Sequence, residues 1–201
     1  MKLFFSPTSP YVRKCLVVAH ELNLIERIQL LPAKAHPVDR DASVIAANPL
    51  GKIPTLITDD AAAVYDSRVI CEYLDDLAGG GLFPRSGAAR WTALTRQSLA
   101  DGMLDAALLA RYETAVRPEA LRWNDWTLGQ IDKLHTSLAA LEAAATALDE
   151  RIDIGSLSIG CALWYIDLRY ADLNWRQRYP KVARWNTQLA QRPSMQAAWA
   201  L

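Results

Sequence analysis

The amino-acid sequence predicts two domains, a small α/β sandwich followed by an all-helical domain. Up to about residue 78, short apolar runs bounded by turn residues alternate with segments of helical periodicity. The glycine run Gly79–Gly81 then marks a linker, and beyond it strand signals stop. We therefore expect an α/β domain over residues 1–78, a linker over 79–88 and a helical domain over 89–201.

The first domain opens with a strand, a helix and a second strand, an order that requires the two strands to pair in parallel. Alternating apolar residues and turn residues predict strands at Lys2–Phe5, Glu26–Leu31, Pro54–Ile57 and Ala63–Tyr65. Helices are expected from Tyr11, over about Arg40–Ala47, and from Ser67, which would cap its own helix. The last two strands are close enough in sequence to form a hairpin around Thr58–Asp60.

Two long apolar stripes predict the helices of the second domain. The first consists of Leu128, Ile131, Leu134, Leu138, Leu141, Ala145 and Leu148, and the second of Ile159, Leu163, Ile166, Tyr170 and Leu173. Each stripe recurs at intervals of three or four residues, so it forms one face of a helix that must be packed against other elements.

Composition and charge exclude several classes of protein. Lys plus Arg and Asp plus Glu number 22 each, so the neutral net charge gives no electrostatic basis for binding nucleic acid or an anionic membrane. The apolar run at the N-terminus is interrupted by Pro7, and no stretch approaches the ~20 apolar residues of a membrane span. The three cysteines, Cys15, Cys71 and Cys161, are widely separated, which argues against a disulfide framework or a zinc site and favours small buried residues. We expect a cytoplasmic protein without a metal.

The tetrapeptide Ser9-Pro10-Tyr11-Val12 follows the first strand and opens the first helix, where thioredoxin-like redox proteins carry C-P-Y-C. Serine and valine replace both cysteines, so the site cannot perform dithiol exchange. A serine hydroxyl there can still donate a hydrogen bond to a bound thiolate, and the helix dipole also favours the anion, so both lower the pKa of the thiol. The alternative is that Ser9 serves only as the helix N-cap.

The segment Asn48–Leu56 reads N-P-L-G-K-I-P-T-L. Pro54 begins a strand, where its missing N–H costs least. A cis Ile53–Pro54 bond would turn the backbone of Ile53 outward as an unpaired strand edge, with which a peptide could pair. The alternative is an ordinary turn before an edge strand.

Asp66 and Ser67 stand at the start of the third helix, where exposed N–H groups and the helix dipole form a site for a carboxylate. Such a start is common and indicates little by itself. A thioredoxin-like fold, however, would bring this motif, Ser9 and Ile53 to the same end of its sheet, and together they predict a site for a thiol peptide.

At these motifs the sequence resembles the glutathione transferase family, and the resemblance extends along essentially the whole chain. The pattern N-P-x-G-K-[IV]-P, followed by an acidic residue and serine, is quite specific for this family, and the ending Gln191-Arg192-Pro193-Ser194 also looks familial. The opening is similar to that of small bacterial members that begin S-P-F/Y-V-R-K. The resemblance implies a thioredoxin-like glutathione-binding domain, an all-helical domain that shapes the second-substrate pocket, a homodimer and a role in detoxification.

Carried over by position, the family pattern makes Ser9 the hydroxyl that activates the thiol. Ile53 would pair with the cysteinyl backbone of glutathione beside cis-Pro54, and Asp66 and Ser67 would hold the γ-glutamyl end. Lys52, or a residue near Lys34 and His36, would hold the glycine carboxylate. Phe5 stands where tyrosine-type members keep their hydroxyl, and Ser6, Thr8 and Tyr11 remain rival hydroxyls to Ser9.

The sequence departs from the family at Ser158-Ile159-Gly160-Cys161. Members usually begin the buried helix of the second domain with Ser/Thr-x-x-Asp, a reciprocal cap. Cysteine occupies the acidic position here, so we expect the helix to begin near Ser158 with only half of its capping box.

Two further assignments rest on the family pattern. Asp101, with Asp105 in reserve, would reach the γ-glutamyl amine of glutathione in the partner subunit; the alternative is a solvated helix face or an internal ion pair. The pocket for the electrophile would be lined by Pro10, Tyr11, Tyr112 and Trp164.

The leading functional hypothesis is a glutathione transferase, in which glutathione is the co-substrate and its thiolate attacks a small hydrophobic electrophile. A glutathione-dependent peroxidase or reductase is an alternative, although members specialised for thiol reduction carry cysteine where this chain has Ser9. A non-catalytic binding or regulatory protein with the transferase fold is a third possibility. The physiological electrophile cannot be read from the sequence.

Overall fold

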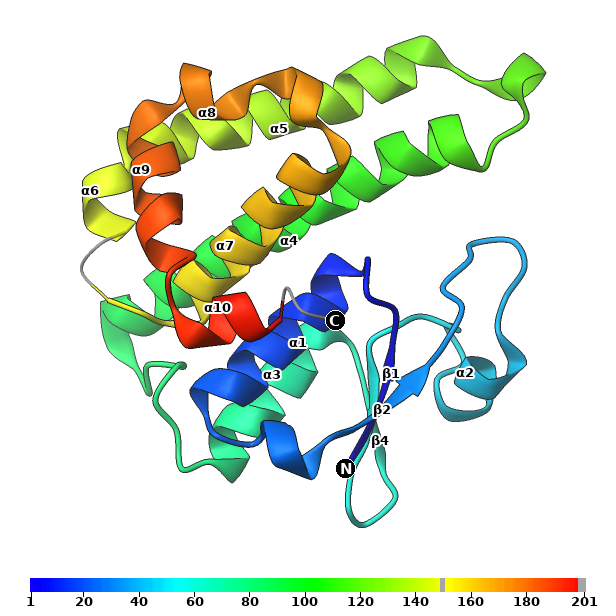
Figure 1. Ribbon diagram of the computed structural model, residues 1–201, viewed down its shortest axis with the longest axis vertical. Helices are drawn as coiled ribbons and strands as arrows, with labels where there is room; N and C mark the ends of the chain where they lie inside the picture. The colour runs from blue at the N-terminus through cyan, green and yellow to red at the C-terminus, as the bar shows by residue number, and fades with distance from the viewer. Residues whose placement is uncertain (149–150, 199–201) are drawn as a thin grey trace. The chain divides into compact units, whose positions relative to one another are not determined.

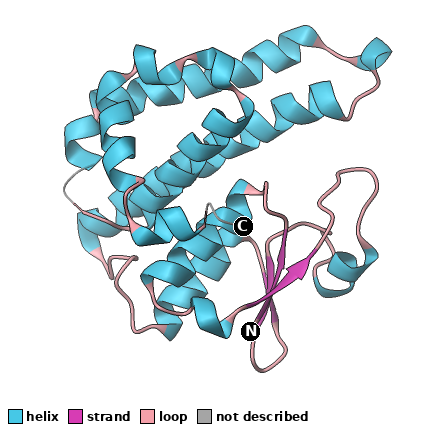
Figure 2. Ribbon diagram, viewed as in Figure 1, coloured by secondary structure: helices cyan, strands magenta, loops and turns pink. Residues whose placement is uncertain are grey.

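The computed structural model describes residues 1–148 and 151–198, which divide into two units (Figure 1). The first unit consists of Met1–Arg90 together with the C-terminal residues from Gln191 onward, and the second of Trp91–Ala190. The first combines strands and helices, whereas the described part of the second is helical (Figure 2). The predicted order of an α/β region followed by helices is therefore confirmed.

A four-stranded mixed sheet forms the centre of the first unit, with strand order β2-β1-β3-β4. Its strands are β1 (Lys2–Phe5), β2 (Gln29–Pro32), β3 (Thr55–Ile57) and β4 (Ala63–Val64). Strand β1 pairs in parallel with β2 and antiparallel with β3, which in turn pairs antiparallel with β4. The expected parallel pair and hairpin are both present. The predicted second strand began too early, because Ile25–Arg27 form a 3₁₀ turn before β2.

Helices α1 (Pro10–Glu21), α2 (Ala42–Ala47), α3 (Ser67–Leu77) and α10 (Pro193–Ala197) complete the first unit. Helix α1 packs against both α3 and α10. The guanidinium of Arg13 in α1 donates to the carbonyl oxygens of Met195 (2.8 Å) and Ala198 (2.5 Å), so the C-terminal segment belongs to this unit. The predicted helical domain extended to residue 201, whereas this packing separates the residues from Gln191 onward from it.

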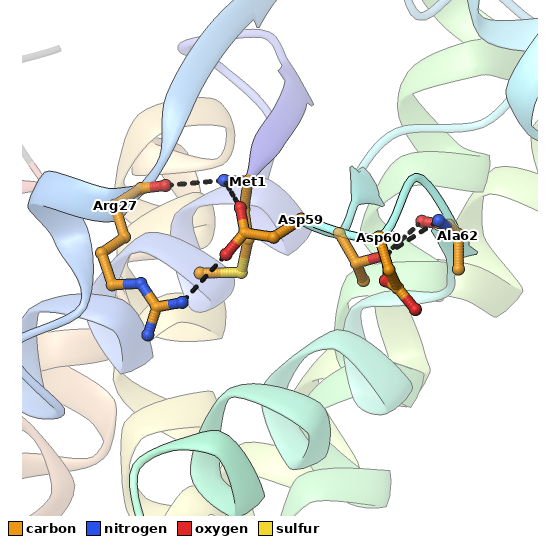
Figure 3. Close-up of polar contacts among 6 residues, drawn as sticks. Met1, Arg27, Asp59, Asp60 and Ala62 are labelled. Carbon is orange, nitrogen blue, oxygen red and sulfur yellow. Dashed lines mark hydrogen bonds and ion pairs between the residues drawn. The ribbon is translucent and has the colours of Figure 1, made fainter.

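The turn of the β3–β4 hairpin is held by polar contacts (Figure 3). The carboxylate of Asp59 accepts from the Met1 ammonium (2.6 Å) and from Arg27 (2.9 Å). These two donors hold the pKa of Asp59 below its usual range. Thr58 donates to the Asp60 carboxylate and accepts from the backbone N–H of Ala62 (2.9 Å). The hairpin is thus tied to the start of β1, at the end of the sheet opposite to the start of α1.

The second unit is built from long helices and short helical turns. Its helices are α4 (Gly87–Ala115, which begins in the first unit), α5 (Asn124–Ala143), α6 (Ala145–Leu148), α7 (Ile154–Arg169), α8 (Trp175–Arg178) and α9 (Pro180–Leu189). Two 3₁₀ turns lie at Glu119–Leu121 and Ala171–Leu173. None of the helices within 1–148 and 151–198 has an apolar stretch long enough to cross a bilayer.

The first predicted apolar stripe is buried from Leu134 to Leu148 but exposed at its start. Leu134, Leu138 and Leu141 are buried, but Leu128 is exposed because the first turns of α5 extend beyond the packed region. In α7 every residue from Ile154 to Ile166 is buried, so burial is not restricted to one stripe.

The start of α7 differs from the sequence prediction. The helix begins at Ile154 rather than near Ser158, and its N-cap is Asp153. The Asp153 carboxylate accepts from the backbone N–H of Ser156 (3.0 Å), and the Ser156 hydroxyl accepts from the backbone N–H of Asp153 (2.9 Å). This is a complete reciprocal cap. Ser158 lies within the helix and donates to the carbonyl of Ile154 (2.7 Å), so a cysteine at position 161 removes nothing from the cap.

Candidate glutathione site

The strand register brings four loops to one edge of the sheet. Phe5 at the end of β1 pairs with Pro32 at the end of β2, and Phe4 pairs with Thr55 at the start of β3. Val64 at the end of β4 pairs with Leu56. The chain therefore leaves β1, β2 and β4, and enters β3, at the same edge. These loops carry Ser9, Lys34, Ile53 and Asp66. We call this end of the sheet, where β1, β2 and β4 end and β3 begins, the site edge.

Ser9 lies at the site edge as the N-cap of α1. Its backbone is extended, with φ −81° and ψ 116°, and its hydroxyl oxygen accepts from the backbone N–H of Val12 (3.3 Å). A hydroxyl has one proton to donate in addition to its acceptor positions. The capping bond therefore leaves the O–H of Ser9 able to donate to a ligand, so capping and thiol activation are compatible rather than alternative roles.

The rival hydroxyls near Ser9 have other surroundings. Ser6 is half-buried and its carbonyl accepts from the backbone N–H of Ser9 (3.1 Å), which closes the turn between β1 and α1. Thr8 is exposed, Tyr11 is half-buried and Pro10 is buried. Among these hydroxyls, Ser9 is the one that caps α1 and thus lies where the helix dipole favours an anion.

The segment between α2 and β3 is organised by the buried side chain of Asn48, which is 1% exposed. Its amide donates to the carbonyl of Lys52 (3.1 Å) and to the Thr55 hydroxyl (3.0 Å), while its amide oxygen accepts from the backbone N–H of Leu50 (3.0 Å). The Thr55 hydroxyl also donates to the Lys52 carbonyl (2.8 Å). These four bonds fix the backbone on both sides of Ile53.

Gly51 and Arg40 complete the support of this segment. Gly51 has φ +60°, and a Cβ at this position would lie 2.9 Å from a guanidinium nitrogen of Arg40. Arg40 in turn donates to the carbonyl of Pro49 (2.7 Å). The backbone conformation thus favours glycine at this position, whereas the Arg40 guanidinium is the flexible end of a side chain and can move.

The segment that these bonds support contains Lys52, Ile53 and Pro54. The Ile53–Pro54 peptide bond is cis, as the sequence analysis expected. Ile53 lies outside the strand ladder, which begins at Thr55, and its side chain is buried. The Lys52 side chain is exposed. The sequence motif contains Asn48, but its spacing alone did not indicate the supporting role of Asn48, Thr55 and Arg40.

Asp66, rather than Ser67, is the N-cap of α3, which corrects the sequence prediction. The Asp66 carboxylate accepts from the backbone N–H of Arg68 (2.9 Å) and pairs with the Arg68 guanidinium (3.3 Å). Ser67 is the first helical residue and is buried. The peptide bond between Tyr65 and Asp66 is cis. Asp66 is exposed at the site edge, whereas Ser67 is buried.

The loop after β2 supplies Lys34 and His36, which are already engaged. The Lys34 ammonium pairs with Asp39, and this contact lowers the pKa of the Asp39 carboxyl. The His36 ring accepts at Nδ1 from the backbone N–H of Asp39 (2.9 Å). Asp41 caps α2, and its hydrogen bonds with Ser43 lower its pKa to about 2. Lys52 is thus better placed than Lys34 to meet a carboxylate from solvent.

The remaining predicted site residues lie in the second unit. Asp101 on α4 is only 4% exposed, whereas Asp105 is exposed. Tyr112 is half-buried, and burial raises the pKa of its hydroxyl. Trp164 is 7% exposed, and its ring centroid lies 6.4 Å from that of Tyr165. A separate hollow of about 640 Å³ between α4 and α5, lined in part by Ser98, Gly102 and Lys133, includes none of the predicted site residues.

Comparison with known proteins identifies the fold and the family. Residues 8–77 match the glutathione S-transferase N-terminal domain, and residues 98–185 match the corresponding C-terminal domain. The uncharacterized GST-like protein YibF of Escherichia coli K12 is 33% identical over 180 residues, which cover 87% of this chain and 86% of YibF. The chain belongs to the glutathione S-transferase family.

Two solved structures that are similar to this glutathione S-transferase family chain contain bound ligands. A glutathione transferase family member from Pseudomonas fluorescens Pf-5 with bound glutathione is 47% identical to this chain, with a TM-score of 0.96 over 98% of this chain and 97% of its own. A second structure from that strain holds S-(propanoic acid)-glutathione; it is 46% identical, with a TM-score of 0.90 and 98% coverage of both chains. The predicted thioredoxin-like plus helical fold is confirmed by these matches.

Proposed function

We propose that this protein is a glutathione transferase that binds glutathione at the site edge and activates its thiol with the Ser9 hydroxyl. The observation that carries the proposal is the convergence of Ser9, Ile53 and Asp66 on one edge of the sheet, at two helix starts and beside a rigid loop. The glutathione-bound relative from Pseudomonas fluorescens supports it.

In this proposal each part of the tripeptide meets a different element. The cysteinyl backbone pairs with the backbone of Ile53, which Asn48 holds in place. The γ-glutamyl end lies at the start of α3, where Asp66 can bind its ammonium and the first N–H groups its carboxylate. Lys52, exposed beside Ile53, takes the glycine carboxylate.

Ser9 then acts on the sulfur. Its O–H donates to the thiolate while the dipole of α1 stabilises the same charge. Lowering a thiol pKa from ~8.5 by about two units raises the thiolate fraction at pH 7 roughly 20-fold. The thiolate attacks an electrophilic carbon, the carbon–sulfur bond forms, and the leaving group departs with the electron pair. The relative bound to S-(propanoic acid)-glutathione supports a site that also accepts an S-substituted tripeptide.

The electrophile pocket and the subunit arrangement are part of the same proposal. Pro10, Tyr11, Tyr112 and Trp164 are proposed to line the pocket, and the protein is proposed to act as a homodimer in the cytoplasm. Since Asp105 is exposed and Asp101 is nearly buried, Asp105 fits a contact to a partner subunit's γ-glutamyl amine better than Asp101 does. Sedimentation velocity and glutathione affinity of Asp101→Asn and Asp105→Asn test this assignment.

The central test combines calorimetry with turnover. Wild-type protein should bind glutathione and conjugate it to an activated aromatic halide, and Ser9→Ala should lose about 100-fold in kcat, the usual loss when one donor to a developing anion is removed. Its glutathione affinity should change far less. Folded protein that takes up no glutathione would refute the proposal, and binding without turnover on any electrophile would favour a non-catalytic binding protein.

Ser9→Cys distinguishes the reductase alternative. A thiol at this position would supply the nucleophile that a glutathione-dependent reductase requires. The wild-type protein should therefore show negligible disulfide reduction, and Ser9→Cys should gain it while losing conjugation. Reductase activity in the wild type that survives Ser9→Ala would contradict the assignment of Ser9.

A further inference from the structure

Two buried thiols face each other between α1 and α3. The Sγ atoms of Cys15 and Cys71 lie 4.0 Å apart, and the residues are 1% and 0% exposed. Both are reduced. The two helices pack directly on each other in the first unit (Figure 1), so the thiols belong to one helix–helix contact rather than to separate surfaces.

The pair lies beneath the two helix starts of the site edge. The Cys15 thiol lies 3.9 Å from the carbonyl oxygen of Ser67, the first residue of α3. Cys15 follows Ser9 by less than two helical turns, and Cys71 follows Ser67 by about one. The chain of contacts from Cys71 through Cys15 to Ser67 thus links the thiols to the residues proposed to bind glutathione.

We propose that Cys15 and Cys71 form a redox-modification site, at which hydrogen peroxide converts the facing thiols into a disulfide between α1 and α3. One thiolate attacks a peroxide oxygen, the O–O bond breaks, and a sulfenic acid and hydroxide form. The second thiolate then attacks the sulfenic sulfur, the S–S bond forms and hydroxide leaves, and the two hydroxides take up the protons that the two thiols released. In sum, two thiols and one peroxide give one disulfide and two waters, with both sulfurs oxidised and the peroxide reduced.

Burial determines the rate of this reaction. Peroxide is small, but it reaches Cys15 and Cys71 only when α1 and α3 separate locally, so oxidation is slower than at an exposed thiol. Once one sulfur is oxidised, the other is already its neighbour. Cys161 is as fully buried on α7 in the second unit, which makes it an internal reference within the same chain.

Ligand binding slows the oxidation, a consequence that rests on the proposed function. Glutathione held by the starts of both α1 and α3 stabilises the closed arrangement of the two helices. If opening releases the ligand, the open population falls by a factor of one plus the ratio of ligand concentration to Kd. At a concentration of 100 Kd, the disulfide should form about 100-fold more slowly.

Peptide mapping tests the pair directly. The full-length reduced protein is treated with hydrogen peroxide, remaining thiols are blocked with N-ethylmaleimide under denaturing conditions, and the protein is digested with trypsin without reduction. The expected product links Cys15–Arg27 to Val69–Arg85, with a mass two hydrogens below the sum of the two peptides. The peptide of Cys161, Ile152–Arg169, should remain unlinked.

Variants and a ligand arm complete the experiment. Cys15→Ala and Cys71→Ala should abolish the linked product, and the matched Cys161→Ala should retain it; if an alanine variant does not fold, the wild-type map alone decides. Absence of the linked peptide while both thiols remain blocked by the maleimide, or a disulfide that involves Cys161, would overturn the proposal.

S-Methylglutathione, which has no thiol, serves as the protecting ligand, and calorimetry on reduced protein first measures its Kd. Protection near 100-fold supports the coupling. Binding without protection refutes the coupling but leaves the disulfide site, whereas no binding of S-methylglutathione or glutathione refutes the proposed function and leaves the first arm of the experiment intact.

Discussion

The two units differ in the kind of internal contact that stabilises each of them. At the site edge of the first unit, polar side chains such as Asn48 and Asp66 hold the backbone through hydrogen bonds near exposed surface. In the second unit, α7 is buried on all sides, and Gly155 brings its backbone against α4. Substitutions among these site-edge contacts should therefore change ligand binding as well as stability, and substitutions in the packed interior around Gly155 should change stability alone.

The strongest test of this difference is Gly155→Ala. A Cβ at this position would lie 2.6 Å from the Cβ of Arg96 and 2.7 Å from the carbonyl oxygen of Ala93, both on α4. Because backbone and Cβ atoms cannot yield as a flexible side-chain end can, we expect the free energy of unfolding to fall by about 3 kcal/mol. Urea denaturation monitored by tryptophan fluorescence measures this loss.

Gly129→Ala is the matched control for Gly155. It lies within α5, and its added methyl group would meet nothing within 4 Å. Helix propensity alone should then stabilise the protein by up to about 1 kcal/mol. Glutathione affinity of the folded protein should be unchanged in both variants, and a tenfold loss of affinity in Gly155→Ala would show that the two units are not separable in this way.

In the first unit, Asn48→Ala should alter both stability and binding. The substitution removes, at a buried position, the amide that donates to the Lys52 carbonyl and the Thr55 hydroxyl. It also removes the oxygen that accepts from the backbone N–H of Leu50. We expect a loss of about 2 kcal/mol in unfolding free energy and, because Ile53 loses its support, roughly a tenfold rise in the glutathione Kd. Calorimetry and urea denaturation on the same preparations measure both.

Thr55→Val is the milder companion of Asn48→Ala. It keeps the shape of the side chain and the contact between Asn48 and Lys52 but removes the hydroxyl bonds. Its effect should have the same direction and a smaller size in both measurements. An Asn48→Ala variant that is destabilised but binds glutathione normally would mean that the loop does not need this scaffold to present Ile53.

A good part of this architecture could be predicted from the sequence. Strand β1 was predicted at its observed bounds, and the hairpin and the cis bond before Pro54 were anticipated, because turn residues and proline act locally. The predicted start of α7 was wrong because the familial Ser-x-x-acid pattern was sought at Ser158. Asp153 and Ser156 form an equivalent cap about one turn earlier, with the acid at the N-cap and the serine three residues later.

Side-chain contacts account for what the sequence did not reveal. Asn48 acts on Lys52 and Thr55 in three dimensions, and nothing in the spacing of these residues distinguishes a scaffold from a turn. The packing of α10 against α1 depends on Arg13 and Glu21, which read in sequence as ordinary charges on an amphipathic helix. The burial of Asp101 was likewise invisible, because helical spacing does not say which neighbour covers a face.

The contact between α1 and α10 makes the stability of the first unit depend on pH. Glu21 accepts from the Arg192 guanidinium (two bonds of 2.8 Å) and from the Ser194 hydroxyl (2.5 Å), and these bonds, the Arg192 bond most of all, hold its pKa below 4.5. A carboxyl group whose pKa is depressed in the folded state stabilises the protein at pH values above its unfolded-state pKa. This stabilisation is lost as the pH falls through its folded-state pKa.

Glu21→Gln tests this linkage. The variant should be less stable than the wild type by about 1 kcal/mol at pH 7, and the difference should shrink below about pH 4.5. Urea denaturation at a series of pH values measures it. Glutathione affinity at pH 7 should not change, since this contact lies away from the site edge, and a difference in stability that stays constant down to pH 3 would contradict the assigned pKa shift.

The smallest expected effect separates two cations at the site edge. Lys52 is exposed beside Ile53, whereas the Lys34 ammonium is paired with Asp39. A solvent-exposed ion pair is worth at most about 1 kcal/mol, so Lys52→Ala should raise the glutathione Kd only a few-fold, and the difference should fade at high salt. Lys34→Ala should leave the Kd unchanged, because binding a ligand carboxylate there would first require the ammonium to leave Asp39. If calorimetry finds the reverse order, the loop after β2 rather than the Asn48 scaffold holds the glycine end. The Asn48 segment would then supply support without the ligand contact, and the loop after β2 would supply the contact to the glycine carboxylate.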